Sequence, residues 1–296
     1  MRTDTLLHKP VKLLAVGSLL FAALVASQSA VAQTIVGSKH DLTSGGAGPI
    51  KTSDANTEIC VFCHTPHGAS NVAPLWNKVL PLTGAFTPRY TSTTMDGTNG
   101  VVGPNSLTCL SCHDGVSAMD TMINQPGSGL YNSAGARPLA GVGYAWAGGV
   151  GASGAMPART ATTNVATIGV DLSDDHPIGI PYCGGFTGAA CNDTDFNTAK
   201  LYRSTGGVAA VATLVPGVAN DQWWVDTSGT VIGAYTAPGT LGTRQKSDLV
   251  LYQDAAFIPT VQCASCHEPH GSSASALTFL RIPNAGSALC VTCHKK

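Results

Sequence analysis

Charge is scarce in this chain, and that scarcity narrows its possible functions. Charged residues make up 11% of the sequence, against about 25% in an average soluble protein, and the formal net charge is −1. Without a basic surface, the chain is not expected to bind nucleic acid. Weak charge gives little electrostatic resistance to self-association and little of the charge complementarity that guides transient docking between proteins.

A long apolar run is also missing. Residues 13–25 are apolar, but a membrane-spanning helix needs about 20 such residues. Basic side chains precede this run, at Arg2, Lys9 and Lys12. The small residues Ala30-Val-Ala32 follow it and resemble the cleavage site of an export signal. We therefore expect residues 1–32 to be a cleaved signal peptide of an exported protein, with an uncleaved membrane anchor as the alternative.

Cysteine, by contrast, recurs in one pattern. The pentapeptide Cys-x-x-Cys-His occurs four times, and we number the copies as the first to fourth motifs: residues 60–64, 109–113, 263–267 and 290–294. Two thiols at this spacing can both add to the vinyl groups on one porphyrin edge, while the adjacent imidazole holds the iron. A single copy also occurs in redox dithiols and zinc sites, but four copies favour c-type haem. The sequence therefore predicts four covalently attached haems with their iron.

The motifs name the residues that would hold each haem. The attaching cysteines are Cys60, Cys63, Cys109, Cys112, Cys263, Cys266, Cys290 and Cys293, and the proximal iron ligands are His64, His113, His267 and His294. Outside the motifs and the first 32 residues, the remaining histidines are His40, His67, His176 and His270. Four irons and four spare imidazoles predict His on both faces of every iron. We therefore expect no open coordination position and no enzymatic activity.

The spare histidines cannot all serve the nearest iron. His67 follows His64 by three residues, which span at most about 10–11 Å, whereas ligands on opposite faces of one iron need Cα atoms roughly 12–13 Å apart. His270 stands in the same relation to His267. Each is therefore expected to reach a neighbouring haem. One assignment within a single chain gives His67 to the second motif's haem and His270 to the fourth's, and leaves His40 and His176 for the other two. A histidine near the start that serves an adjacent subunit is the alternative.

An internal repeat organises the chain. The stretch from Cys60 to Gly68 is echoed by the stretch from Cys263 to Gly271, and a simpler motif follows each. We expect a first haem pair in residues 33–120, a Gly/Ala/Thr-rich cover in 121–249, and a second haem pair in 250–296. Within the cover, the Val-rich stretches 208–218 and 223–232 predict short strands. Trp223 and Trp224 are interpreted as packing residues, with a stacking platform for a ligand as the alternative.

Composition also bears on the fold class. Gly (34) and Pro (17) are plentiful, and little of the sequence has the pattern of a stable amphipathic helix. We predict a coil-rich fold with short helices at the motifs and few short strands, wrapped around a stack of four haems that supplies part of the core. The two cysteines outside the motifs, Cys183 and Cys191, are expected to form a disulfide in an oxidising compartment, with two buried thiols as the alternative. The methionines at 95, 119, 122 and 156 are interpreted as packing residues.

Several segments together resemble a known family. They are Lys39-His-Asp-Leu42, Cys60-Val-Phe-Cys-His-Thr-Pro-His-Gly68, Pro74-Leu-Trp-Asn77, Cys109-Leu-Ser-Cys-His-Asp-Gly115, Asp175-His-Pro-Ile-Gly179 and the fourth motif. The sequence is similar to the extracellular tetrahaem cytochromes of the OmcE type, which polymerise into electron-conducting filaments, and more broadly to doubled-CXXCH multihaem proteins. The resemblance covers the haem-bearing ends and not the middle. It implies an axial histidine donated across the subunit interface, with His67 as the first candidate and His40 as the second.

These inferences predict an electron-transfer protein outside the cell. It would pass electrons from haem to haem along a head-to-tail homopolymer, between outer-membrane cytochromes and an extracellular acceptor. The first alternative is a monomeric periplasmic electron shuttle. The second is a multihaem reductase, which needs an iron with an open position, and the equal numbers of irons and spare histidines disfavour it.

Overall fold

The computed structural model describes most of one compact unit, Gln33–Lys296. The described residues are 35–52, 57–71, 73–125, 131–136, 146–147, 150, 153–160, 163–187, 190–202, 221–227, 247–271 and 279–295. The predicted signal peptide, the Val-rich stretch 208–218 and residues 228–232 lie outside them. Within these ranges, no helix has the length and apolar character needed to cross a membrane.

Four helices lie at the motifs, as the sequence predicts. They are η1 (Ile59–Phe62), α2 (Pro104–His113), α3 (Cys263–Cys266) and α4 (Ala288–Cys293). In the first motif, the backbone N–H of His64 donates to the carbonyl of Cys60 at 2.7 Å, and the third and fourth motifs repeat this bond at 3.1 and 2.9 Å. Residues i, i+3 and i+4 share one face of a helical turn. Each turn therefore brings two thiols and an imidazole to the same side.

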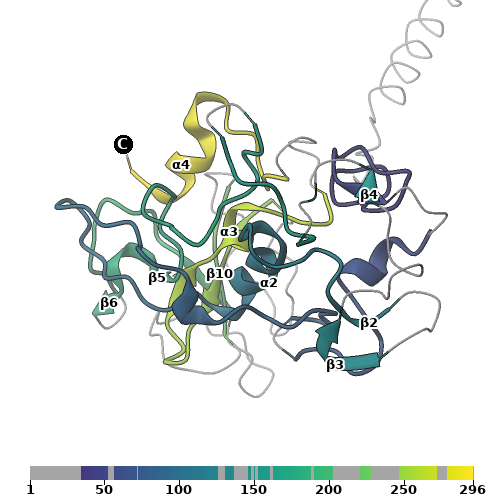
Figure 1. Ribbon diagram of the computed structural model, residues 1–296. Coiled ribbons are helices and arrows are strands. Elements are labelled where there is room, and N and C mark those ends of the chain that lie inside the picture. Colours follow the sequence, from purple (N-terminus) through teal and green to yellow (C-terminus); the bar gives the residue numbers. More distant parts are fainter. Residues whose placement is uncertain are drawn as a thin grey trace, which may run out of the picture. The chain divides into compact units, whose positions relative to one another are not determined.

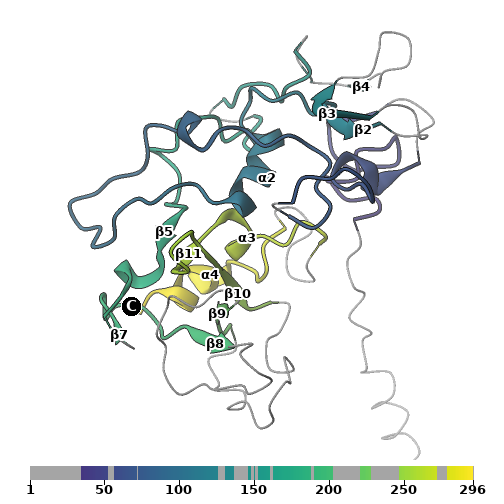
Figure 2. The same cartoon turned by 90° about the horizontal axis from the view of Figure 1, so that it is seen from below.

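A five-stranded antiparallel sheet lies beside the third motif, in the order β5-β11-β10-β9-β8. Its strands are β5 (Ile180–Pro181), β11 (Pro259–Val261), β10 (Leu249–Gln253), β9 (Gln222–Val225) and β8 (Lys200–Tyr202). Helix α3 follows β11 and lies next to β10 (Figures 1 and 2). Strand β10 crosses the expected boundary between the cover and the second haem pair, so the described part of the cover and the residues just before the third motif share one sheet.

The sheet carries the largest core cluster. Trp223 and Trp224 on β9 are 0% and 1% exposed, and Leu201, Leu249 and Tyr182 are buried with Trp223. The indole Nε1 of Trp224 donates to Asp226 at 2.9 Å. Burial of both tryptophans agrees with a packing role and leaves no exposed ring face on which a ligand could stack.

The remaining strands form three small antiparallel ladders. Strand β1 (Lys51–Thr52) pairs with β4 (Trp146–Ala147), β2 (Met122–Asn124) with β3 (Tyr131–Ala136), and β6 (Phe186–Thr187) with β7 (Ala190–Cys191). A disulfide joins Cys191 of β7 to Cys183, which precedes β6. Three short 3-10 helices complete the described elements: η2 (Thr83–Ala85), η4 (Tyr182–Gly184) and η5 (Ala285–Ser287). The described residues thus form the expected coil-rich fold, although the joining of five strands into one sheet was not foreseen.

Candidate haem-binding site

The first motif is held by a turn that doubles back on it. After His64 the chain runs through Pro66 and returns, so that the backbone N–H of Thr65 donates to the carbonyl of Leu75 at 2.8 Å. Two residues further on, the N–H of Asn77 donates to Cys63 O at 2.8 Å, and its side-chain Nδ2 donates to Val61 O at 2.6 Å. The returning segment therefore fixes the backbone that carries Cys63, the second attaching cysteine.

The third motif is held in the same way. The N–H of Glu268 donates to Phe279 O at 2.7 Å, and the N–H of Arg281 donates to Cys266 O at 2.8 Å. The Arg281 side chain takes the place of Asn77, because its Nε donates to Ala264 O at 3.0 Å. The sequence repeat ends at Gly271, but the structural repeat continues through this returning segment. The described residues of 60–77 and of 263–281 are therefore two copies of one haem-bearing unit.

Histidine rings from distant parts of the chain face each other in two pairs. The ring centroids of His64 and His270 are 5.9 Å apart with an interplanar angle of 19°. Those of His40 and His113 are 6.1 Å apart at 64°. Two imidazoles on one metal need centroids about 6 Å apart, because each metal–nitrogen bond is about 2 Å long and the ring centre lies about 1 Å beyond the nitrogen. Both pairs therefore have the spacing of axial ligands to a shared iron.

The other ring nitrogen of each of these histidines already has a partner. In each case Nδ1 lies within hydrogen-bonding distance of a protein oxygen: Pro74 O at 2.8 Å for His64, Ala166 O at 2.7 Å for His113, Pro269 O at 3.1 Å for His40, and Glu268 Oε1 at 3.3 Å for His270. An Nδ1–H that donates to such an oxygen leaves Nε2 as the free lone pair. This is the arrangement that orients metal-binding imidazoles.

Burial favours the neutral form of one of these pairs. It lowers the pKa of His40 to about 4, against the opposing effect of the hydrogen bond to Pro269. Burial also lowers the pKa of His113. Because only a neutral imidazole can donate a lone pair to iron, both rings are in the ligating form at neutral pH.

The attaching cysteines connect each motif to the next. Burial raises the pKa of Cys63 to about 12, and nearby Cys112 of the second motif adds to the effect. The nearby Cys263 of the third motif, together with burial, raises the pKa of Cys109 in the second motif. Burial raises the pKa of Cys293 in the fourth motif to about 12, and Cys266 contributes. None of the eight motif cysteines forms a disulfide. In both views α2 and α3 lie side by side, between α4 and the purple helix that precedes His64 (Figures 1 and 2).

A buried donor near the first motif also fits a haem. The indole ring of Trp76 packs edge-on against the ring of His64, with centroids 5.8 Å apart. Its Nε1–H is buried and has no hydrogen-bond acceptor among the described residues. A buried donor without an acceptor is costly unless a bound group satisfies it. The chain's own residues here thus supply two thiols, two facing imidazoles and an unused donor, which together fit a covalently attached haem.

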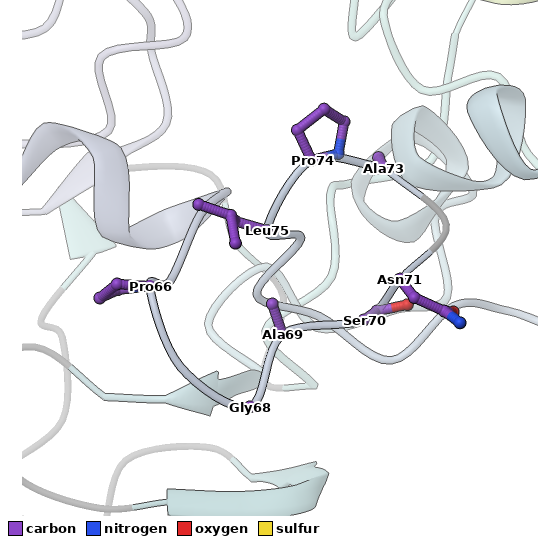
Figure 3. Close-up of a pocket in the computed structure, with 8 residues that line it drawn as sticks. All are labelled: Pro66, Gly68, Ala69, Ser70, Asn71, Ala73, Pro74 and Leu75. Carbon is purple, nitrogen blue, oxygen red and sulfur yellow. The ribbon is translucent and has the colours of Figure 1, made fainter.

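The other two spare histidines lie at the surface, and the side chain of His270 is also 58% exposed. His176 is exposed, with Nδ1 3.0 Å from Pro177 O, and the segment after it enters β5, where Ile180 pairs with Val261 just before the third motif. His67 is exposed as well, at the turn after the first motif. A cavity of about 610 Å³ lies at this turn and is lined by the residues that precede and follow His67 in the sequence (Figure 3). Its lining is uncharged and consists of Pro66, Gly68, Ala69, Ser70, Asn71, Ala73, Pro74 and Leu75.

The pairing differs from the single-chain assignment considered from the sequence. That assignment gave His270 to the fourth motif and His67 to the second, whereas the structure places His270 opposite His64 and His40 opposite His113. The reason is the packing of α3 against α2, which sets the third motif beside the second. The turn that follows the third motif then lies over the first motif.

Comparison with known proteins finds a match to the last part of the chain. A family model of the doubled CXXCH motif matches residues 258–296, which contain the third and fourth motifs. No curated protein matches the chain. The doubled CXXCH motif is that of multihaem c-type cytochromes, and it implies covalently bound c-type haem and a role in electron transfer.

Proposed function

We propose that the protein is a tetrahaem c-type cytochrome that carries electrons from haem to haem outside the cell, as a head-to-tail filament. The observation that carries the haem assignment is the pair of facing imidazole couples, His64 with His270 and His40 with His113. Iron with histidine on both faces exchanges single electrons and has no position for a substrate. The chain's residues then set the spacing, ligation and burial of each haem.

The order of the motifs supports a continuous row. Cysteines of the first and second motifs interact, as do those of the second and third and those of the third and fourth. A haem attached at each motif would therefore have a neighbour close by. The row would run from the first motif at one end to the fourth at the other, so an electron that enters at one end can leave at the other by successive one-electron transfers.

The distribution of spare histidines supports joining of subunits. His270 and His40 face the first and second motifs, and the segment of His176 lies beside the third. The spare histidine that remains is His67, and the motif that remains is the fourth. His67 belongs to the first-motif end of the row, so we assign it to the fourth haem of an adjacent subunit. Each such bond would join the last haem of one chain to the first of the next.

The surface around His67 suits contact with a second copy. The cavity beside it has an uncharged lining, and Leu75 in that lining is 52% exposed. Covering apolar surface of this kind with another surface lowers the free energy. Because the chain carries few charges, its copies repel one another weakly.

The decisive experiment is cryo-electron microscopy of the native secreted protein, with an electron paramagnetic resonance spectrum of the same sample. Filaments with an unbroken haem row and His67 on a neighbour's iron are expected. Dispersed monomers with only low-spin iron would instead indicate the periplasmic shuttle. Monomers with a high-spin iron would indicate the reductase.

A substitution separates the ligand role of His67 from general damage. His67→Ala should abolish filaments and convert one iron in four to high-spin. Added imidazole should occupy the vacated position and restore the low-spin spectrum, but it should not restore filaments. Leu82→Ala changes an exposed residue outside this turn and its cavity, and it is the control that should keep both. Filaments of normal length from His67→Ala would overturn the proposed donation.

A further inference from the structure

Two of the positions at which the haem-bearing units differ are in contact with each other in the second unit. Thr65 of the first unit is replaced by Glu268 in the second, and Asn77 is replaced by Arg281. The side chains of Glu268 and Arg281 form an ion pair, with Arg281 Nη1 3.3 Å from Glu268 Oε2. The second unit therefore holds an acid and a base where the first holds two neutral side chains.

The carboxylate of this pair is also directed at an axial histidine. Glu268 Oε1 accepts from the backbone N–H of His270 at 3.3 Å and lies 3.3 Å from its ring Nδ1. Among the paired imidazoles the other three, His40, His64 and His113, have a neutral backbone carbonyl at Nδ1. His270 alone of these four faces a carboxylate.

Burial makes the ion pair between Glu268 and Arg281 stronger than a pair at the surface. The side chains of Arg281 and Glu268 are 6% and 14% exposed, and Arg281 is fixed further by its bond to Ala264 O. Charges removed from water interact more strongly than exposed ones. Arg281 thus holds the carboxylate in place, with one oxygen toward the guanidinium and the other toward His270.

We propose that Glu268 is a positioning residue that lowers the reduction potential of the first haem through His270. The inference rests on the proposed function, in which His64 and His270 ligate that iron. An imidazole N–H that donates to a carboxylate becomes a stronger electron donor to its metal. Such a ligand would stabilise the ferric over the ferrous state of a bound haem, so that iron would give up one electron to a neighbouring haem more readily and accept one less readily. The second unit thereby tunes a haem that it does not itself attach.

The repeat provides the matched variant. Glu268→Thr copies the first unit, and Glu268→Gln keeps the side-chain shape while removing the negative charge. Both should shift one of the haem potentials to a more positive value in a spectroelectrochemical titration of the haem-loaded protein, with Glu268→Thr giving the larger shift. All irons should remain low-spin, and one set of low-spin g values should change because the His270 ring is held differently. Glu58→Gln removes an exposed carboxylate just before the first motif and should leave both the potentials and the g values as in the parent.

Two outcomes would overturn the proposal. Low-spin irons with unchanged potentials in both Glu268 variants would show that the carboxylate does not tune the haem. A high-spin iron in Glu268→Gln would show that the residue supports ligation as a whole. His270→Ala distinguishes these failures from failure of the proposed function. One high-spin iron in that variant confirms the ligand, whereas a fully low-spin spectrum would remove His270 as a ligand and the basis of the tuning with it.

Discussion

The rings of His64 and His270 lie 5.9 Å apart and within 19° of parallel, although the two residues come from opposite ends of the chain. His270 ends the turn after the third motif, and His64 belongs to the first. A shared iron between them would tie the two haem-bearing units to each other through a metal bond as well as through side-chain packing. Binding of the first haem would therefore stabilise contacts distant in sequence, since a group that binds only the folded chain shifts the folding equilibrium toward it.

The second facing pair gives a prediction about ring orientation. The ring of Phe279 stacks on that of His40, with centroids 4.1 Å apart and planes 9° from parallel. Phe279→Leu removes this flat surface and leaves the hydrogen bond from His40 to Pro269. We expect the second iron to stay low-spin while its g values shift, because the imidazole plane is free to turn. Electron paramagnetic resonance of the haem-loaded variant measures this.

His40→Ala is the companion variant. It removes the ligand itself and should make the second iron high-spin. A fully low-spin spectrum from His40→Ala would show that His113 pairs with another residue. Loss of the low-spin signal in Phe279→Leu would mean that stacking, and not the bond to Pro269, holds the ring.

The local features of the site could be predicted from the sequence. Cysteine spacing gives the helical turns at the motifs, because the geometry of one turn depends only on near neighbours. The closeness of Cys183 and Cys191 follows in the same way from the short separation between them. The pairing of His270 with His64 could not be predicted from the sequence in this way, since it depends on the packing of α3 against α2. That contact is set by side chains that are distant in sequence.

The pair of Glu268 and Arg281 was not predicted, although the sequence holds a signal for it. Alignment of the two haem-bearing units places Thr65 with Glu268, but the partner position of Arg281 becomes visible only when the returning segments are superimposed. The loop before Arg281 is one residue longer than the loop before Asn77. An alignment of the motifs without a gap therefore does not place Asn77 opposite Arg281. The structure shows that the two residues correspond, because the backbone N–H of Asn77 donates to Cys63 O and that of Arg281 donates to Cys266 O.

Lys78 is predicted to stabilise the first unit from within. Its side chain is buried at 2% exposure, and its Nζ donates to Ala118 O, Met119 O and Thr121 O at 3.1, 2.9 and 3.0 Å. Lys78→Met fills similar space but leaves these carbonyls without a donor, at a cost of about 1–3 kcal/mol for each group that stays buried. We therefore expect a loss of about 3 kcal/mol or more in the free energy of unfolding, measured with denaturant on the haem-loaded protein.

The exposed Lys39 supplies the control for that measurement. Lys39→Met should change the free energy of unfolding by no more than about 0.5 kcal/mol, as is usual for surface positions. An equal effect of the two substitutions would show that the carbonyl bonds of Lys78 contribute little.

The disulfide should matter for stability and not for the haems. Cys183 and Cys191 are 8 residues apart, and a loop of this size stabilises a fold by about 2–3 kcal/mol in the chain-entropy description. Replacing both with Ser should lower the free energy of unfolding by about that amount. The haem absorption per chain should be unchanged, because the eight motif cysteines are separate from this pair. A variant that lost haem would show that the hairpin supports the fourth motif, which Tyr182 approaches through its hydroxyl.

Asn77 is expected to be the most sensitive polar position of the first unit. Its side chain is fully buried, donates to Val61 O at 2.6 Å and to Asn124 O at 2.8 Å, and accepts from Asn124 N at 2.8 Å. Asn77→Ala leaves these groups unpaired and should cost about 2–4 kcal/mol in unfolding free energy. Asn77→Asp distinguishes the contribution of side-chain shape from that of the two donated hydrogen bonds. It keeps the acceptor but turns a carboxylate toward two carbonyl oxygens, so it should cost at least as much as the Ala variant and broaden the signal of the first iron. If the Asn77→Asp substitution were tolerated, shape at this position, and not the two donated bonds, would hold the first motif in place.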